Sequence, residues 1–120
     1  MTQVVNLQQK FGLFADHWHP RVVGELNGQQ VKLAKLQGEF TWHAHAEEDE
    51  LFLVIAGELQ MRFRDRTEIV RAGEFIIVPR GVEHCPVALS EVQVMLFEPA
   101  STVNTGAVRE SRTRDTLERI

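Results

Sequence analysis

Short runs of apolar or alternating residues, separated by glycine, proline and charged turns, make up most of this sequence. The clearest is residues 59–64, in which apolar and polar residues alternate with a period of two, as on a strand with one buried face. The same reading predicts further strands at residues 31–33, 39–45, 51–56, 67–71, 75–78, 84–89 and 92–97. Helical spacing is confined to residues 5–14 and the end of the chain. Many short strands with Gly and Pro turns predict an all-β sandwich or barrel.

The length of 120 residues suits one domain, and the 43% hydrophobic content is that of a globular protein. The single cysteine, Cys85, excludes an internal disulfide framework and a thiolate-cluster zinc site. We expect one barrel domain over residues 1–100, with a short N-terminal extension, and a polar tail over residues 101–120. Because residues 109–120 are mostly charged, we expect a solvated, partly disordered end; the alternative is an arm that reaches a neighbouring subunit.

The net charge of −4 and the lack of a basic patch with aromatic residues argue against nucleic acid or an anionic membrane as a partner. A small-molecule ligand or substrate is the better expectation. The N-terminal residues lack the pattern of a secretory signal, and the longest apolar run, residues 51–56, is too short to span a membrane. A cytoplasmic location follows as the default expectation.

Three histidines and one glutamate have the spacing of a metal site. On a strand, residues two apart point to the same face, so His43 and His45 would present two imidazoles side by side. After an acidic turn, Glu50 begins the next strand, and a hairpin would return its carboxylate to these rings. The turn residues before His84 could bring a third imidazole. This set suits one divalent Mn, Fe, Co, Ni, Cu or Zn ion and would leave positions for water, dioxygen or substrate oxygens.

These segments resemble the two paired motifs of the cupins, which are small jelly-roll β-barrels. The first motif, Gly, His-x-His, Glu and Gly, is met by Gly38, His43, His45, Glu50 and Gly57, with a first gap one residue shorter than usual. The second is met by Gly73, Pro79, Gly81 and His84, whereas its final Asn is replaced by Ala88. Within the superfamily the chain is similar to small single-domain cupins of the cupin 2 type, often labelled mannose-6-phosphate isomerase-like. That label rests on the barrel and implies no such activity.

Neighbouring polar residues offer alternatives. Glu47 or Glu48 could replace Glu50 if the loop were offset, although a solvated turn is favoured for both. His17 and His19 form a second His-x-His pair but have no carboxylate at hairpin spacing, so we expect surface or interface packing around Trp18. Cys85 should point away from His84 and act as a small buried filler.

Glu39 lies on the strand face predicted for His43 and His45, which makes it the candidate catalytic acid or base. The competing interpretation places it in water at the barrel rim. Arg80 and Glu83 flank His84 and could contact an anionic ligand, but we expect both at the surface.

The alternation also predicts an assembly. If His43 and His45 face inward, Phe40 and Trp42 face outward, and Leu51 and Leu53 do so on the next strand. Apolar residues on both faces need a second cover, so we expect a homodimer through Phe40, Trp42, Leu51 and Leu53.

The leading functional hypothesis is a metal-dependent enzyme that acts on a small polar metabolite, such as a sugar, a keto acid or an aromatic ring. The resemblance to cupins implies isomerase, lyase, decarboxylase or dioxygenase chemistry. The alternative is a non-catalytic barrel that binds or senses a small ligand, and a third possibility is a barrel that keeps its metal for stability. The complete ligand set favours the enzyme, because packing alone does not need three imidazoles and a carboxylate.

Overall fold

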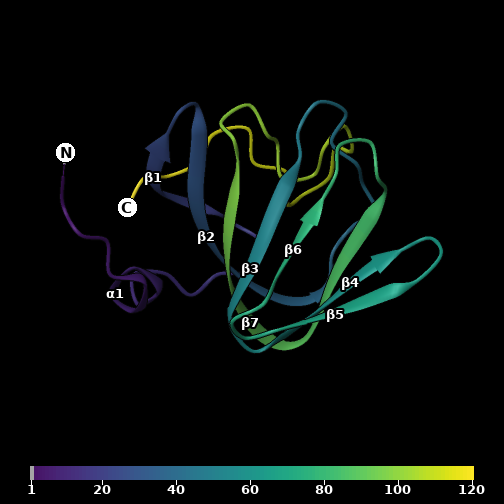
Figure 1. The fold of residues 1–120 in the computed structure, drawn as a ribbon, viewed down its shortest axis with the longest axis horizontal. Coiled ribbons are helices and arrows are strands. Elements are labelled where there is room, and N and C mark those ends of the chain that lie inside the picture. The colour runs from purple at the N-terminus through teal and green to yellow at the C-terminus, as the bar shows by residue number, and fades with distance from the viewer. Residues whose placement is uncertain (1) are drawn as a thin grey trace.

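The structure, a computed structural model, describes residues 2–120 as an antiparallel β-barrel with one short helix (Figure 1). The helix and the strands, in chain order, are α1 (Leu7–Phe11), β1 (Arg21–Leu26), β2 (Gln29–Glu39), β3 (Glu50–Ala56), β4 (Glu58–Phe63), β5 (Thr67–Arg71), β6 (Phe75–Val78) and β7 (His84–Pro99). The sheet runs in the order β1-β2-β7-β3-β6, and β4 pairs with both β7 and β5. The predicted all-β fold is confirmed.

Strand β7 holds the barrel together because it pairs with three strands. Its first residues pair with β4, and its later residues pair with β2 on one side and β3 on the other. Two separate strands were predicted here, with Ser90 and Glu91 between them. The structure has one strand, and the irregularity falls on β7: Leu36 pairs with Val92 and Gly38 with Ala88, so residues 89–91 of β7 lie opposite the single residue Gln37 of β2.

The core lies between the two halves of the barrel and follows the period-two alternation. Every second residue is buried along β4, along residues 50–54 of β3 and along residues 92–98 of β7, as the sequence predicts for strands with one inner face. The first five residues of β7 are all buried, and the next three are exposed. The buried residues that meet there include Phe52, Val54, Leu59, Met61, Phe63, Val92, Val94 and Leu96.

The N-terminal segment supplies α1, within the stretch where helical spacing is found. Asn6 caps the helix by accepting a hydrogen bond from the backbone N–H of Gln9 at 2.9 Å, and Phe11 at its end is buried. Within residues 2–120, no helix is long and apolar enough to cross a membrane.

The C-terminal residues fold back onto the barrel and bond to it, whereas the side chains of residues 109–120 are half-buried or exposed. Arg119 forms a parallel bridge with Val22, whose N–H donates to the carbonyl of Glu118 at 2.9 Å. Thr105 is fully buried, and its hydroxyl lies 2.7 Å from that of Thr113. The polar side chains of this segment bond to one another and to its own backbone, which composition alone does not reveal.

The predicted outward position of Phe40 is also wrong, because its side chain is buried inside the barrel. Strand β2 ends at Glu39, and the next paired residue is His43, so the alternation does not continue through residues 40–42. Trp42 lies under the guanidinium of Arg64, 3.9 Å from its ring centroid. Leu51 and Leu53 do face outward, where they pair with exposed Ile77 and Phe75 of β6 and with Phe97 and Met95 of β7.

Candidate metal centre

The four predicted ligands lie together inside the barrel. His43, His45, Glu50 and His84 each offer one ligand atom, and these atoms all lie within 4.8 Å of one another. All four side chains are buried. Glu50 is the first residue of β3, His84 is the first of β7, and the other two lie in the connection between β2 and β3.

Backbone pairing holds the histidines in place. His43 and His84 exchange two backbone hydrogen bonds of 3.1 and 2.9 Å, which bring their ring centroids to 4.3 Å. The carbonyl of His45 accepts a hydrogen bond of 2.8 Å from the N–H of Gly81. Because Gly81 has φ of +77°, a conformation that favours glycine, this turn can pass close to the His45 loop.

Two of the imidazoles are oriented by backbone carbonyls. The Nδ1 of His43 lies 2.9 Å from the oxygen of Thr41, and the Nδ1 of His84 lies 3.0 Å from that of Val82. A ring N–H that donates to a carbonyl leaves the other nitrogen, Nε2, free as a metal ligand.

The atoms that face the centre have no hydrogen-bond partner within the described chain. They are Nε2 of His45, Oε1 of Glu50 and Nε2 of His84. Oε1 of Glu50 lies 3.2 Å from Nε2 of His45 and 3.7 Å from Nε2 of His84. Buried polar atoms without partners are costly, and a divalent ion among these donors would satisfy all of them at once. The residues therefore fit a metal ion.

The protonation states also suit a metal. Burial, followed by the neighbouring His84, lowers the pKa of His43 from 6.5 to about 4, so the ring is neutral near pH 7. Burial alone would raise the pKa of Glu50, but the neighbouring side chains of Glu98, His45 and His84 together hold it well below its usual value. Metal binding requires neutral imidazoles and ionised carboxylates.

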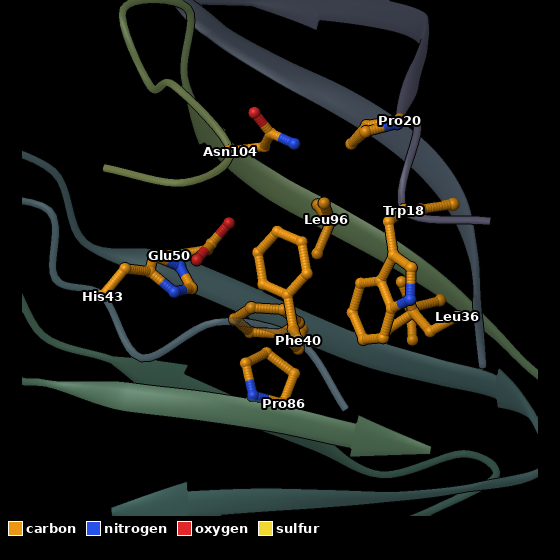
Figure 2. Close-up of a pocket in the computed structure, with 12 residues that line it drawn as sticks. Trp18, Pro20, Leu36, Phe40, His43, Glu50, Pro86, Leu96 and Asn104 are labelled. Carbon is orange, nitrogen blue, oxygen red and sulfur yellow. The ribbon is translucent and has the colours of Figure 1, made fainter. Parts of the chain in front are cut away.

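A pocket adjoins the cluster and extends into the core (Figure 2). His43 and Glu50 lie at one end of the view, and Trp18 and Leu36 lie at the other. The cavity has a volume of about 40 Å³. Its lining is mostly aromatic and aliphatic: Trp18, Pro20, Ala34, Leu36, Phe40, His43, Glu50, Phe52, Pro86, Val94, Leu96 and Asn104.

Comparison with known proteins identifies the family. The Cupin_2 family of cupin domains matches residues 29–98. This range contains all four candidate ligands and runs from the first residue of β2 to the last but one of β7. This chain is a cupin.

Relatives of known structure share the cupin barrel. A cupin-2 domain containing protein from Shewanella frigidimarina is 50% identical, with a TM-score of 0.79 over 80% of this chain and 94% of that one. Protein NMB1881 from Neisseria meningitidis is 28% identical, with a TM-score of 0.75 over 82% of this cupin and 100% of that chain. By sequence, the chain is also similar to the uncharacterized protein YdbB from Bacillus subtilis, with 40% identity over 63 residues, which are 52% of this chain and 56% of that protein.

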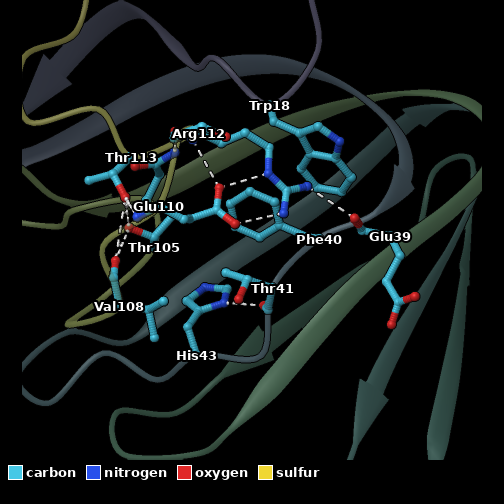
Figure 3. Close-up of polar contacts among 12 residues, drawn as sticks. Trp18, Glu39, Phe40, Thr41, His43, Thr105, Val108, Glu110, Arg112 and Thr113 are labelled. Atoms are coloured by element: carbon cyan, nitrogen blue, oxygen red, sulfur yellow. Dashed lines mark hydrogen bonds and ion pairs between the residues drawn. The ribbon is translucent and has the colours of Figure 1, made fainter.

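The cupin's C-terminal segment forms part of the pocket wall (Figure 3). Arg112 lies over Phe40, with its guanidinium carbon 4.7 Å from the ring centroid, and donates at 3.0 Å to the backbone carbonyl of Glu39. Glu110 binds the same guanidinium through both carboxylate oxygens at 2.7 Å. The amide of Asn104, which lines the pocket, donates to the carbonyl of Arg112 at 2.9 Å.

Glu39, the candidate catalytic residue, does not lie in this pocket. Its carboxylate points away from His43 in Figure 3, its side chain is 59% exposed, and its nearest cation is Arg62 at 3.9 Å. Since β2 ends at Glu39, the face that it shares with His43 in an unbroken strand does not exist. The rim position, which was the competing interpretation, is the observed one.

The other polar residues near the motifs lie outside the cluster. His17 and His19 pair with Glu91 and Asp16 at the surface. Glu47 and Glu48 do not join the cluster, and Glu48 accepts a hydrogen bond from Ser101 at 2.8 Å.

The flanking residues of the second motif are also accounted for. Arg80 and Glu83 are exposed; Arg80 pairs with Asp49, and Glu83 pairs with Arg64. Cys85 is fully buried, with Sγ 3.5 Å from the carbonyl of Phe40, and burial raises the pKa of its thiol. A thiol held neutral in this way suits the predicted role as a filler.

Sequence reasoning missed a buried ion pair behind the metal ligands. Lys32 and Glu98 are almost fully buried and are joined by a 2.7 Å contact. Burial, and then the charge of Glu50, raises the pKa of Glu98 well above its usual value, against the opposing effect of Lys32. The alternation could have predicted that both side chains face inward, because Lys32 shares a strand face with buried Ala34, and Glu98 shares one with buried Leu96.

Trp18 was expected at the surface or an interface but forms one wall of the pocket. Its ring stacks on Phe40 at 4.5 Å, and its Nε1 donates to the carbonyl of Gln37 at 2.9 Å. It also has φ of +60°, which is unusual for a bulky residue. The sequence around Trp18 has no pattern that would predict its place in the pocket wall.

Proposed function

We propose that this cupin is a metal-dependent enzyme that binds one divalent ion through His43, His45, Glu50 and His84 and acts on a small metabolite in the adjoining pocket. The observation that carries the proposal is the set of buried, unpartnered donor atoms that face one another at the end of this pocket. Zn, Fe, Mn and Ni are all compatible with three imidazoles and a carboxylate.

The protein's own residues would set the ligand field and exclude water. Thr41 and Val82 fix the tautomers of His43 and His84 through their backbone carbonyls. A bound divalent ion supplies Lewis-acid chemistry, which polarises a substrate oxygen and suits isomerase, lyase, decarboxylase or dioxygenase reactions. Trp18 and Phe40 line the pocket beside the ligands, Arg112 lies over Phe40, and these side chains would limit access of water.

The second candidate is a barrel that binds or senses a small ligand without turnover. One observation favours it: apart from the candidate ligands, none of the described residues that line the pocket has a side chain that titrates, so the lining offers no general acid or base. The enzyme remains the leading proposal, since a metal can activate a substrate without a separate acid or base. A cytoplasmic location stays a prediction for either function.

Metal content tests the proposal. We expect about one equivalent of a transition metal, by elemental mass spectrometry, in untagged protein purified without chelators. H45A should lose this metal, whereas H19A, which removes a surface histidine of the second His-x-His pair, should keep it. No metal in the wild type, and none taken up on soaking, would overturn the metal site and leave the binding barrel.

Screening then separates the enzyme from the binder. A small-molecule panel should yield a product whose formation needs the metal and is absent in H45A. A ligand that raises the melting temperature of the metal-loaded protein and is recovered unchanged would favour the binding barrel.

A further inference from the structure

We infer that the ligand of this site carries a compact apolar group directly beside its metal-binding oxygens, as in a small aliphatic oxo or hydroxy acid, and is not a polyhydroxylated sugar. The inference rests on the proposed function and narrows its substrate class. From the sequence, the substrate could be a sugar, a keto acid or an aromatic ring. The lining of the pocket distinguishes among these substrate classes.

The first observation is the chemistry of the wall. Beyond the metal ligands, the residues that line the pocket are aliphatic or aromatic, except for Asn104. Val94 is fully buried, and Ala34 and Leu96 are nearly so. A hydroxyl group placed against these side chains would lose its hydrogen bonds to water and find no partner in exchange.

The second observation is that the polar groups at the rim are already engaged. The amide nitrogen of Asn104 donates to Arg112, and its oxygen accepts from the N–H of Arg114 at 2.9 Å. The guanidinium of Arg112 is held by Glu110 and by the carbonyl of Glu39 (Figure 3). An anionic ligand would therefore have to displace an existing carboxylate to reach Arg112, which leaves the metal as its main polar anchor.

The third observation is size. The cavity of about 40 Å³ is well below the ~150 Å³ of an apolar protein cavity that takes up benzene. By that comparison, the enclosed part has room for a group of roughly one to three carbons. His43 and Glu50 are part of the lining, and in Figure 2 they lie to one side of Phe40 and Leu96, so a group enclosed by this lining would adjoin the metal position.

Two chelating probes of equal size test the inference on the Co²⁺-loaded full chain. Propionohydroxamate and glycolohydroxamate bind metals through the same two oxygens and differ by a methyl group in place of a hydroxyl. Binding is followed by the visible spectrum of the Co²⁺ ion, after the metal content has been measured. We expect propionohydroxamate to bind at least ~10-fold more tightly, because the methyl group gains apolar burial and the hydroxyl group loses its partners.

Variants locate the selectivity. V94T keeps the shape of a fully buried wall residue but adds a hydroxyl, and should reduce the preference for propionohydroxamate several-fold. A34S provides a second, smaller change in the same wall if V94T folds poorly. The matched control is V70T, at a buried valine of β5 outside the pocket, which should leave the preference unchanged.

The outcomes separate this inference from the proposed function. Equal affinity for the two probes, tighter binding of glycolohydroxamate, or a preference that neither V94T nor A34S reduces would overturn the inference and leave the metal site standing. Failure of the wild type to bind Co²⁺ would overturn the proposed function, and the inference with it.

Discussion

The ammonium group of Lys32 lies 2.7 Å from Oε1 of Glu98, and each of these side chains is only 2% exposed. The pair sits inside the barrel, where burial, together with the charge of the neighbouring metal-ligand candidate Glu50, raises the pKa of Glu98. The two side chains meet because β2 and β7 are paired, and Lys32 and Glu98 each lie on the inner face of their strand. A buried charge is tolerated when its partner is present and is costly when that partner is removed.

The first prediction follows from this dependence. K32M should lower the free energy of unfolding by roughly 3–5 kcal/mol, because it leaves the buried carboxyl group of Glu98 without its polar partner. The double variant K32M/E98L should lose less than the sum of the two single variants, since no unpaired charge then remains. Urea unfolding of the four proteins, all without metal, measures this coupling. Additive losses would show that the two side chains do not stabilise each other.

The second prediction concerns pH. The pKa of His43 is about 4 in the fold, below its ordinary value of 6.5, so the unfolded chain binds this proton first as the pH falls. The metal-free protein should therefore keep its full stability above pH 6.5 and lose up to ~3 kcal/mol between pH 6.5 and 4 from this group. Glu50, whose pKa is also lowered, adds a loss at the acidic end of this range.

Urea unfolding at a series of pH values measures this loss, and H43F is the matched control. Phenylalanine has a similar shape and does not titrate, so the difference in slope between the two proteins isolates His43. Parallel slopes between pH 6.5 and 5 would contradict a lowered pKa. With metal bound, the wild type should resist acid more strongly, because protons must first displace the ion.

The metal ligands could be predicted from sequence because their geometry is local. His43 and His45 are two residues apart, Glu50 starts the next strand, and His84 follows a turn that the glycine and proline residues mark. These relations need only the period of a strand and the direction of a hairpin. The cupin resemblance rests on the same residues, and the match over residues 29–98 confirms the family.

The wall of the pocket could not be predicted in the same way. Phe40 was misplaced because the alternation was extended beyond the end of β2, and for the same reason the alternation could not decide between the pocket and the rim for Glu39. Trp18 reaches the pocket, and Arg112 reaches the pocket residue Phe40, only through tertiary packing, with Trp18 at a positive φ that no pattern indicates. Lys32 is the intermediate case, since alternation places it inward but its partner Glu98 lies 66 residues away.

The third prediction is that two copies of the chain associate through the outer face of β3, β6 and β7. Leu53 lies between Phe75 and Met95, and Leu51 lies between Ile77 and Phe97, so the apolar side chains form two rows across three strands. Phe75 and Ile77 are 61% and 52% exposed, which is a large apolar area for a single chain to leave in water. This face keeps Leu51 and Leu53 of the predicted interface and replaces its other two residues.

Sedimentation velocity at micromolar concentration should show a dimer. F75E/I77E should be monomeric, because its two carboxylates would be buried without partners in the interface. The control L89E changes another exposed residue of β7 (79% exposed) and should remain dimeric. A monomeric wild type would contradict the prediction.

The fourth prediction concerns the contact between the C-terminal segment and the metal loop. Gly106 has φ of +61°, and a Cβ atom added there would collide with the carbonyl oxygen of Ala44, the residue between His43 and His45. G106A must therefore push the C-terminal turn away from the loop or shift the loop itself. We expect a clear loss of stability and weaker metal binding, because the shifted backbone carries two of the ligands.

The control for G106A is G28A, at a glycine that also has a positive φ, +78°, but has open space around its Cβ position. G28A should lose about 1–2 kcal/mol from backbone strain alone and leave metal affinity unchanged. Urea unfolding and a metal titration of both variants separate strain from collision. If G106A loses no more stability than G28A and binds metal as the wild type does, the C-terminal segment does not support the metal loop; a larger loss with weakened binding means that this segment is part of the site.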